Sequence, residues 1–431
     1  MRCVLSLLIL TLNVSAFGNA LSETEKNLIA TIDAHEQEAR ALLKKVVNIN
    51  SGSMNFAGVR EVGDVFRRAF ADLGFDARWV DGEAWGRAGH LVARRGHRGL
   101  HFLMIGHLDT VFESDSPFQT YEPKSGTWIG GPGISDMKGG DVVILEALRA
   151  LHQAGVLDDM TVSVVMIGDE ESSGRPLSLA RGDLKAVADA ADVALAFENG
   201  DDDPSTAVIA RRGYTGWRLK VKGRPAHSSQ IFKPDVGYGA IYETARILNG
   251  FRQKFAGERY LTFNPGIVLG GTTVDYDAAH TRGDAFGKPN VIAEHAVVSG
   301  DLRTLTPEQN ERARNGMQNN VLQHLPHTQS RIKFSEGYPP LAPTEGNRKL
   351  LKLYSQVSQD LGYGSVTAVD PGSAGAADIS FTAGRVDMAL DGLGLLGKGA
   401  HTVEEQANVA LLPQQAKRAA LLMYCLTQTS D

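Results

Sequence analysis

The chain has 431 residues, with 44 Lys and Arg against 50 Asp and Glu, which gives a formal net charge of −6 at pH 7. Hydrophobic residues make up 42% and charged residues 22%, so disordered and collagen-like classes are excluded. The mild acidity argues against a nucleic-acid partner, because nucleic-acid-binding proteins carry a basic face. The two cysteines, Cys3 and Cys425, are too few for a disulfide framework or a thiolate zinc site.

Residues 1–20 have the pattern of a secretory signal peptide. A positively charged start precedes an apolar run over residues 3–12, and the small residues Ala16 and Ala20 each fit a cleavage site. The apolar run is shorter than the about 20 residues that a membrane span needs. We therefore predict a periplasmic or secreted protein that is free of the membrane once the signal is removed. A short hydrophobic strand or a membrane anchor is the alternative.

The spacing of apolar residues predicts helices at the start of the mature chain and then alternating strands and helices. We expect helices over residues 22–47, 59–73, 142–154 and 177–189, and strands over residues 100–105, 160–167 and 192–197. The strands are almost continuously apolar, which is typical of a sheet covered by helices on both faces. The expected class is therefore α/β, with a mainly parallel sheet between helices.

The pattern changes near residue 212 and changes back near residue 340. Between them we expect a strand at 214–222, a helix at 236–255, strands at 261–269 and 290–303, a helix at 307–325 and a strand at 330–335. This β-α-β-β-α-β order is the ferredoxin-like pattern. A helix at 345–361, a strand at 365–369 and a helix at 412–426 then resume the earlier style. We predict one domain from residues 21–211 and 341–431, with residues 212–340 inserted into it.

The segment from Asp275 to Lys288 is longer and more polar than a tight connection between two strands requires. We expect it to be a solvated loop. A variable loop that shapes specificity is the alternative.

Histidine or carboxylate side chains follow each of the three apolar strands of the larger domain. His107 and Asp109 follow the first strand, Glu170 and Glu171 the second, and Glu198 the third. Ligands of open α/β sheets bind at the carboxyl ends of the strands, so these side chains are expected to meet. Carboxylates in contact resist joint ionisation unless a cation neutralises them. The pattern therefore predicts a metal site.

Two Gly-rich segments add one candidate ligand each. Asp136 lies in residues 130–140, just before a predicted helix, and His401 follows residues 392–399. Each candidate has an ordinary alternative when taken alone, such as a helix N-cap for Asp136 or an exposed loop residue for His401. These alternatives must hold together at five strand or loop ends, so the metal site is the simpler hypothesis.

The resemblance to a known family rests on seven segments in fixed order, from about His107 to Thr402. They are GHLDTV, GISDMKGG, GDEESSG, AFENG, GRPAHSS, PNVIAEHAVVSGDLR and GLGLLGKGAH. Together they resemble the dinuclear zinc carboxypeptidases and aminoacylases, which include glutamate carboxypeptidase and succinyl-diaminopimelate desuccinylase. The resemblance implies a zinc-peptidase catalytic domain and an inserted ferredoxin-like dimerisation or lid domain. The usual Gly-Gly-Ser/Thr-Asp stretch departs from the pattern here, because residues 375–378 read Gly-Ala-Ala-Asp.

The resemblance implies that two divalent metal ions are held by five side chains. Asp136 would bridge the ions, with His107 and Glu198 completing one site and Glu171 and His401 the other. Oxygen and imidazole ligands without thiolates suit zinc, and they also admit cobalt or manganese. The peptide bond after the bridging Asp136 is expected to be cis.

The resemblance also implies roles around the metal ions. Glu170 would be the general base that activates water and returns the proton to the leaving amine. Asp109, two residues after His107, would orient that histidine.

The inserted domain is expected to supply further groups to the site. The resemblance implies that His227 reaches across a homodimer to stabilise the tetrahedral oxyanion. Asn290 and Arg303 match positions that hold the substrate, and Arg303 suits a bidentate contact with a carboxylate. Without the resemblance, His227 reads as a surface histidine and Arg303 as part of a salt bridge at a strand end.

The predicted function is an exported metal-dependent amidohydrolase, most like a glutamate-type carboxypeptidase. It would cleave the amide bond before a free carboxylate of a small peptide or N-acyl amino acid. The alternatives are an aminoacylase, which deacylates N-acyl amino acids, and a dipeptidase. A non-catalytic binding protein on the same fold is an alternative of another class, which predicts loss of a metal ligand or of the base. All five ligands and Glu170 are present.

Overall fold

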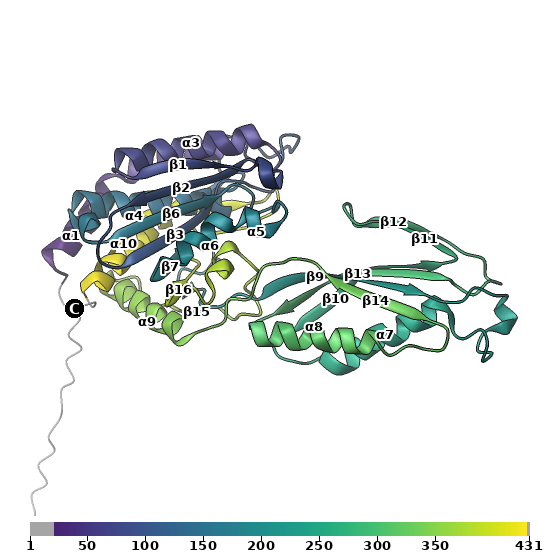
Figure 1. Cartoon of the computed structure of the whole chain (residues 1–431). Helices are drawn as coiled ribbons and strands as arrows, with labels where there is room; N and C mark the ends of the chain where they lie inside the picture. The colour runs from purple at the N-terminus through teal and green to yellow at the C-terminus, as the bar shows by residue number, and fades with distance from the viewer. Residues whose placement is uncertain (1–20, 429–431) are drawn as a thin grey trace, which may run out of the picture.

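A six-stranded sheet forms the centre of the larger body of the molecule (Figure 1). This computed structural model describes residues 21–428, so the predicted signal peptide and Cys3 lie outside the described residues. The strand order is β1-β2-β6-β3-β7-β16, and the four strands from β6 to β16 run parallel. The prediction of a mainly parallel sheet is therefore confirmed. The bounds are β1 Asp76–Asp81, β2 Gly89–Arg95, β3 His101–His107, β6 Thr161–Ile167, β7 Val193–Ala196 and β16 Met388–Leu390.

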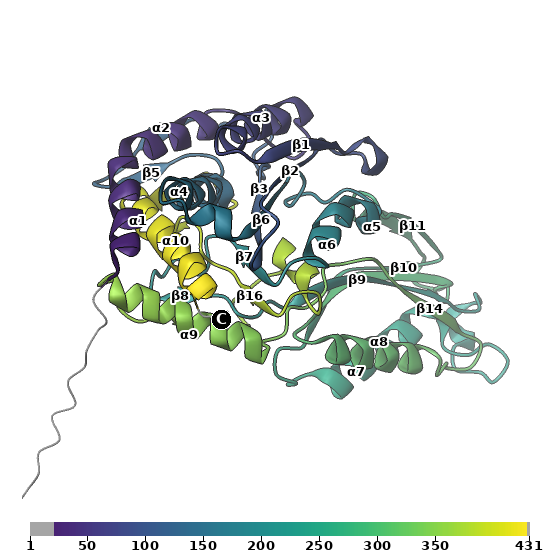
Figure 2. The same ribbon diagram turned by 60° about the vertical axis from the view of Figure 1, so that its left-hand side comes forward.

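Helices cover both faces of this sheet, as the continuous apolar strands predict. Phe102 and Met104 of β3 pack into one core, and Leu103 and Ile105 of the same strand pack into the other. Figure 2 shows α4 and α10 on one side of the sheet and α5 and α6 on the other. The helices of this body are α1 Glu23–Ala34, α2 Glu36–Val47, α3 Phe56–Asp72, α4 Gly139–Gln153, α5 Leu177–Ala180, α6 Gly182–Ala188, α9 Glu345–Asp360 and α10 Leu412–Gln428.

Two of the expected helices are each divided by one residue. The first predicted helix breaks at His35, whose ring nitrogen Nδ1 lies 2.8 Å from the carbonyl oxygen of Thr31 and so takes part in ending α1. The predicted helix over residues 177–189 breaks at Arg181, whose side chain is fully buried. The side chain of Arg181 bonds to Asp169 and Asp378, which lie outside this helical segment, and periodicity does not reveal such contacts.

Strands β1 and β2 were not predicted from the sequence. They pair antiparallel at one edge of the sheet, where β1 has a partner on one side only. Their exposed or half-buried residues include Arg78 and Arg94, so the continuous apolar run that marks the central strands is missing.

A second, four-stranded sheet is formed by residues 213–334 (Figure 1). Its order is β10-β13-β9-β14 and every neighbouring pair is antiparallel. Helices α7 and α8 cover one face, where Trp217 and Leu219 pack with Phe251 and Met317. This is the predicted β-α-β-β-α-β order. The bounds are β9 Gly213–Lys222, α7 Gly239–Phe255, β10 Thr262–Gly271, β13 His295–Thr304, α8 Pro307–Val321 and β14 Gln329–Phe334.

The segment between Asp275 and Lys288 is mostly exposed, as expected, but it is not a loop. The segment contains a hairpin, β11 (Thr273–Asp277) and β12 (Arg282–Phe286), which lies on the face of the small sheet that α7 and α8 leave open (Figure 1). The ring of Tyr276 packs under the guanidinium of Arg218, 5.4 Å from its centroid, and this contact joins the hairpin to β9. The polar composition concealed the strands because only one side of the hairpin packs against protein.

Short strands support the Gly-rich segments of the larger body. Their bounds are β4 Glu122–Pro123, β5 Trp128–Gly130, β8 Thr206–Ala207, β15 Thr367–Ala368, β17 Gly397–Lys398 and β18 Gln406–Asn408. The predicted strand at residues 365–369 is thus only two residues long. Among the described residues, no helix has the length and apolarity that a membrane span requires.

Candidate metal centre

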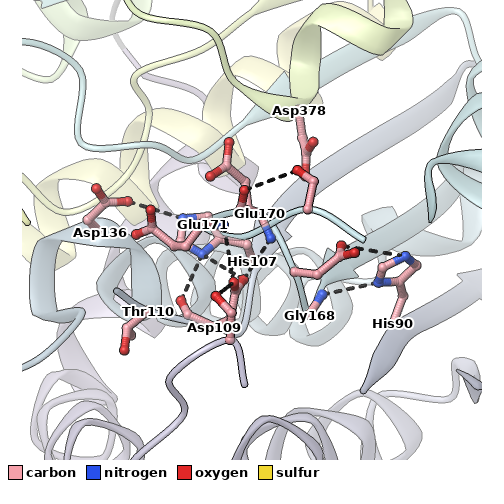
Figure 3. Close-up of polar contacts among 12 residues, drawn as sticks. His90, His107, Asp109, Thr110, Asp136, Gly168, Glu170, Glu171 and Asp378 are labelled. Carbon is pink, nitrogen blue, oxygen red and sulfur yellow. Dashed lines mark hydrogen bonds and ion pairs between the residues drawn. The ribbon is translucent and has the colours of Figure 1, made fainter. Parts of the chain in front are cut away.

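The predicted ligands from the sheet lie at the carboxyl ends of three adjacent parallel strands. His107 is the last residue of β3, Glu170 and Glu171 lie just beyond β6, and Glu198 lies just beyond β7. Because β6, β3 and β7 are neighbours in register, their ends meet at one edge of the sheet. Figure 3 shows His107, Asp109 and Glu171 together, with Asp136 on one side and Glu170 and Asp378 on the other.

Asp136 lies between two groups of candidate ligands. Its Oδ1 is 3.1 Å from Nε2 of His107, and its Oδ2 is 3.1 Å from Nε2 of His401. Glu198 Oε1 lies 3.8 Å from His107 Nε2, and Glu171 Oε2 lies 3.2 Å from His401 Nε2. Ligand atoms within each of the two groups, His107–Asp136–Glu198 and Asp136–Glu171–His401, lie within 4.8 Å of one another. The structure thus brings the five predicted ligands together in the predicted grouping.

Asp136 is held by the turn in which it lies. The turn spans Ile134–Lys138 directly before α4, and the peptide bond between Asp136 and Met137 is cis, as expected. The buried carboxylate of Glu405 accepts hydrogen bonds from the backbone N–H groups of Gly133, Ser135 and Asp136, at 2.9, 2.9 and 3.1 Å. Glu405 therefore anchors the turn from a distant part of the chain.

Asp109 fixes more of the centre than its predicted contact with His107. Nδ1 of His107 lies 3.0 Å from the carbonyl oxygen of Asp109 and 3.6 Å from its carboxylate, so a proton on Nδ1 leaves Nε2 free to face Asp136. The carboxylate also accepts hydrogen bonds from the N–H groups of Glu170 and Glu171, at 2.9 and 3.1 Å, and from Ser53 Oγ at 2.5 Å. Asp109 thus links the end of β3 to the loop after β6.

The pKa values report a strong concentration of negative charge. Burial would lower the pKa of His107, but hydrogen bonds to Asp109 and Asp136 and the charge of Glu198 raise it well above its usual value. Hydrogen bonds to Asp136 and Glu171 raise the pKa of His401 to about 11. Both histidines therefore sit where the surrounding carboxylates favour positive charge.

Three glutamates in the centre resist ionisation. Burial, followed by the charge of Asp136, raises the pKa of Glu198 well above its usual value, and burial also raises the pKa of Glu171. Burial and then the charges of Asp378 and Glu198 raise the pKa of Glu170 well above its usual value. Glu170 belongs to neither of the two ligand groups and precedes the ligand Glu171 in the chain.

The residues present fit a pair of divalent cations. Two imidazole nitrogens and carboxylate oxygens, with no thiolate, form a donor set that suits zinc, cobalt or manganese. Burial and the neighbouring carboxylates raise the pKa values of the three glutamates, and bound cations would favour their ionised forms. A shared carboxylate with one oxygen toward each group is the geometry of a bridging ligand.

The residues predicted from the small sheet lie apart from this cluster. His227 is exposed, its Nδ1 bonds to Ser229 Oγ, and no contact with the five ligands occurs among the described residues. Asn290 lies beside it, because its carbonyl accepts a hydrogen bond from Ser228 N. The structure therefore places His227 and Asn290 together but does not bring them to the metal centre of the same chain.

Arg303 lies at the opposite end of the small sheet. The register pairs Arg303 with Tyr214 and His295 with Lys222, so the two ends are about 26 Å apart at the rise of a β-strand. The guanidinium of Arg303 bonds to Asp301 Oδ2 at 2.9 Å and lies over the ring of Tyr214. In the single chain Arg303 thus forms a salt bridge at a strand end, which is the alternative to a substrate contact that the sequence left open.

Several residues that shape the centre were not singled out in the sequence. Glu405, Ser53 and Arg181 lie in segments without a distinctive motif, and each is far in sequence from the group that it binds. A buried charge in a loop has no periodic signal. The position of Glu405, four residues after His401, was the one available indication.

Comparisons with known proteins agree with this geometry. Residues 103–424 match the sequence profile of peptidase family M20/M25/M40. The chain belongs to this family. Carboxypeptidase G2 of Pseudomonas sp. (strain RS-16) is 25% identical over 415 residues, which cover 94% of each chain. Members of the family are metal-dependent peptidases and amidohydrolases, and the chain is an enzyme of that class.

Two further relatives show the breadth of the family. Succinyl-diaminopimelate desuccinylase of Gluconacetobacter diazotrophicus is 25% identical over 368 residues, covering 80% of this chain and 86% of the relative. The solved structure of YXEP from Bacillus subtilis, a dinuclear metal-binding peptidase, superposes with a TM-score of 0.63 at 16% identity, covering 92% of this chain and 99% of that one. The structural likeness confirms the fold.

Replacing Glu405 by Ala should lower metal affinity by about 10- to 100-fold, because the three N–H groups that orient the turn of Asp136 lose their acceptor. Competition with a chelator measures this affinity. The matched control is the exposed neighbour Glu404, whose replacement by Ala should leave the affinity within about twofold. Equal affinities for the two variants would show that Glu405 does not support the centre.

Proposed function

We propose that the chain is an exported, zinc-dependent carboxypeptidase, which hydrolyses the amide bond before a free carboxylate and releases the C-terminal amino acid. The observation that carries the proposal is the pair of ligand groups sharing Asp136, with Glu170 beside them. The match to carboxypeptidase G2 over nearly the whole of both chains supports the carboxypeptidase reaction. The pattern of residues 1–20 supports export.

Amide hydrolysis needs a group that activates the carbonyl and the water, and a group that transfers the proton. Two divalent ions, when bound to the five ligands, supply Lewis acidity to the amide carbonyl and to a nearby water. Glu170 takes the proton of the attacking water and delivers it to the leaving amine. Burial raises the pKa of Glu170, which favours the first step, because a carboxylate of higher pKa is a stronger base toward water.

The groups around Glu170 keep it in place for proton transfer. Its backbone N–H donates to Asp109 Oδ1, and the neighbouring Glu171 donates to Oδ2 of the same carboxylate. The two glutamates therefore keep fixed positions relative to His107, and one can ligate while the other remains free. This division of roles depends on Asp109 as the common anchor.

Substrate contacts are proposed for the small sheet. Arg303 is suited to bind the free carboxylate of the substrate. To do so, its guanidinium would leave Asp301, which it binds in the single chain. His227 and Asn290 are adjacent but distant from the centre of their own chain, so their proposed roles require a second copy. We therefore propose a homodimer in which His227 of one copy stabilises the oxyanion formed in the other.

Two other reactions use the same proposed metals and base. An aminoacylase reaction is favoured by the match to a succinyl-diaminopimelate desuccinylase over 86% of that relative. A dipeptidase differs only in the group that precedes the scissile bond. A binding protein without activity is disfavoured, because the five ligands come together in two groups and Glu170, bonded to Asp109, is also present.

The substrate class is tested with the zinc-loaded protein on matched compounds: N-acetyl amino acids, dipeptides, and aroyl-glutamates with a free or an amidated carboxylate. We expect release of the C-terminal amino acid, lost on amidation because the proposed clamp then lacks its charge. Replacing Glu170 by Ala should retain both metals and lower kcat by about 10²- to 10⁴-fold, since the proton carrier is removed.

The outcomes separate the alternatives. Preference for acetyl compounds regardless of the C-terminal group would assign the chain to the aminoacylases. Normal turnover by the Glu170→Ala variant with both metals bound would remove Glu170 from the role of base.

The proposed dimer is tested by mixing two inactive variants, Glu170→Ala and His227→Ala, under conditions of subunit exchange. Half of the random dimers are mixed, and each mixed dimer has one intact site, so about one quarter of wild-type activity should return. Each variant incubated alone is the control. If no activity returns although the subunits exchange, His227 does not act across the dimer.

A further inference from the structure

The small sheet is joined to the larger body by two paired segments. Arg211 and Leu341 exchange hydrogen bonds of 3.0 Å in both directions, and Tyr214 N donates to the carbonyl oxygen of Tyr338 at 2.9 Å. Any change in the orientation of the small sheet must therefore act on this pair of segments, which we call the junction (residues 211–214 and 336–341).

The side chain of Tyr338 extends from the junction into the larger body. Its hydroxyl accepts a hydrogen bond from Arg181 Nη2 at 2.8 Å and lies 2.8 Å from Ser173 Oγ. Its ring packs against Phe381 with centroids 4.9 Å apart. Burial, with the charges of Asp378 and Glu170, raises the pKa of Tyr338 well above its usual value, so the hydroxyl keeps its proton.

One of the groups that bind Tyr338, Ser173, belongs to the loop that carries the proposed base. Ser173 lies three residues after Glu170 in this loop, and both Ser173 Oγ and the hydroxyl of Tyr338 lie 3.5 Å from the carbonyl oxygen of Glu170. At its other side the loop is bonded to Asp109 through the N–H groups of Glu170 and Glu171. The loop is thus held between the metal centre and the junction.

Arg181 makes this connection rigid. Its guanidinium is fully buried, donating to Asp169 Oδ1 at 2.6 Å and to Asp378 Oδ1 at 2.6 Å. Asp169 also accepts a hydrogen bond from Gly174 N at 2.8 Å, which closes the loop on itself. A buried cation with two carboxylate partners leaves Tyr338 little freedom to move alone, because displacement would leave polar groups without partners.

A second contact joins the same two regions. Glu336 of the junction accepts a hydrogen bond from Leu177 N at 2.9 Å through Oε2, and its carbonyl accepts one from Arg175 at 3.2 Å. Tyr338 therefore binds both ends of residues 173–181, and Glu336 binds the middle of the same segment.

We propose that Tyr338 is a positioning residue that sets the loop of Glu170 and Glu171 according to the orientation of the small sheet. The assignment of Glu170 as base rests on the proposed function, whereas the mechanical link rests on the contacts of Tyr338, Ser173 and Arg181. Movement of the small sheet that draws residues 336–341 away pulls the hydroxyl from Ser173 and loosens the loop. Substrate held by the small sheet would thereby also order the base.

The link itself is tested by hydrogen exchange of the full chain, which needs no substrate. Replacing Tyr338 by Phe removes only the hydroxyl and should accelerate amide exchange in residues 168–176 by about tenfold or more. The matched control is Tyr424→Phe, at a half-buried tyrosine of α10 whose hydroxyl makes no hydrogen bond within residues 21–428. Equal exchange of this segment in both variants overturns the proposal.

The effect on catalysis is tested by separating kcat from KM. Tyr338→Phe should lower kcat by about tenfold, with KM within about twofold and both metals retained, because a misplaced base slows chemistry rather than binding. Ser173→Ala should lower kcat similarly. The double variant should be no worse than either single variant, because each substitution breaks the same contact between Tyr338 and Ser173. Unchanged kcat, or losses that add in full, contradicts the positioning role.

The two proposals fail in different ways. Absence of turnover by the wild-type protein on every carboxylate and acyl compound contradicts the proposed function, while the exchange measurement still decides whether Tyr338 holds the loop. Normal wild-type turnover with an unaffected Tyr338→Phe variant contradicts the positioning role alone.

Discussion

The position of Asp136 is the constraint on which the rest of the centre depends. One oxygen faces His107 and the other faces His401, at equal distances of 3.1 Å. The two ligand groups therefore cannot be arranged independently, because a displacement of this one carboxylate disturbs both. The close carboxylates repel one another, so the arrangement needs either protons or cations to be stable.

Buried carboxylates outside the ligand groups hold this arrangement together. Glu405 binds the backbone of the turn that carries Asp136, and Asp109 binds the backbone of Glu170 and Glu171. Each works through N–H groups, so it fixes the path of the chain and leaves the side chains of that segment free to face the centre. Tyr338 contacts the same loop from the junction, through the side chains of Ser173 and Arg181.

The central sheet and the ligand set could be predicted because they leave local signals. β3, β6 and β7 are continuous apolar runs, each followed at once by His107, by Glu170 and Glu171, or by Glu198. Adjacent parallel strands bring the residues that follow their carboxyl ends to the same edge of the sheet, however far apart these residues lie in the sequence. Asp136 and His401 were candidates from their Gly-rich segments, but their assignment to the two ligand groups required the resemblance to the family, because a Gly-rich loop does not specify where its polar residue points.

The parts that escaped prediction depend on contacts between distant segments. Glu405 and Arg181 are identified by burial and partners, which no periodicity reports. The hairpin β11–β12 was taken for a loop because only one of its sides packs on the small sheet. His227 illustrates another limit, since its proposed partner groups lie outside the single chain.

Metal binding by variants of the shared ligand is the most direct test of the account. Wild-type protein should bind two zinc ions per chain, as the two ligand groups require. Replacing Asp136 by Asn should weaken both sites by at least about tenfold, whereas Glu198→Gln should weaken one and spare the other. Measurement of zinc stoichiometry and affinity separates these cases. Retention of one site at wild-type affinity in the Asp136→Asn variant would contradict a bridging role for Asp136.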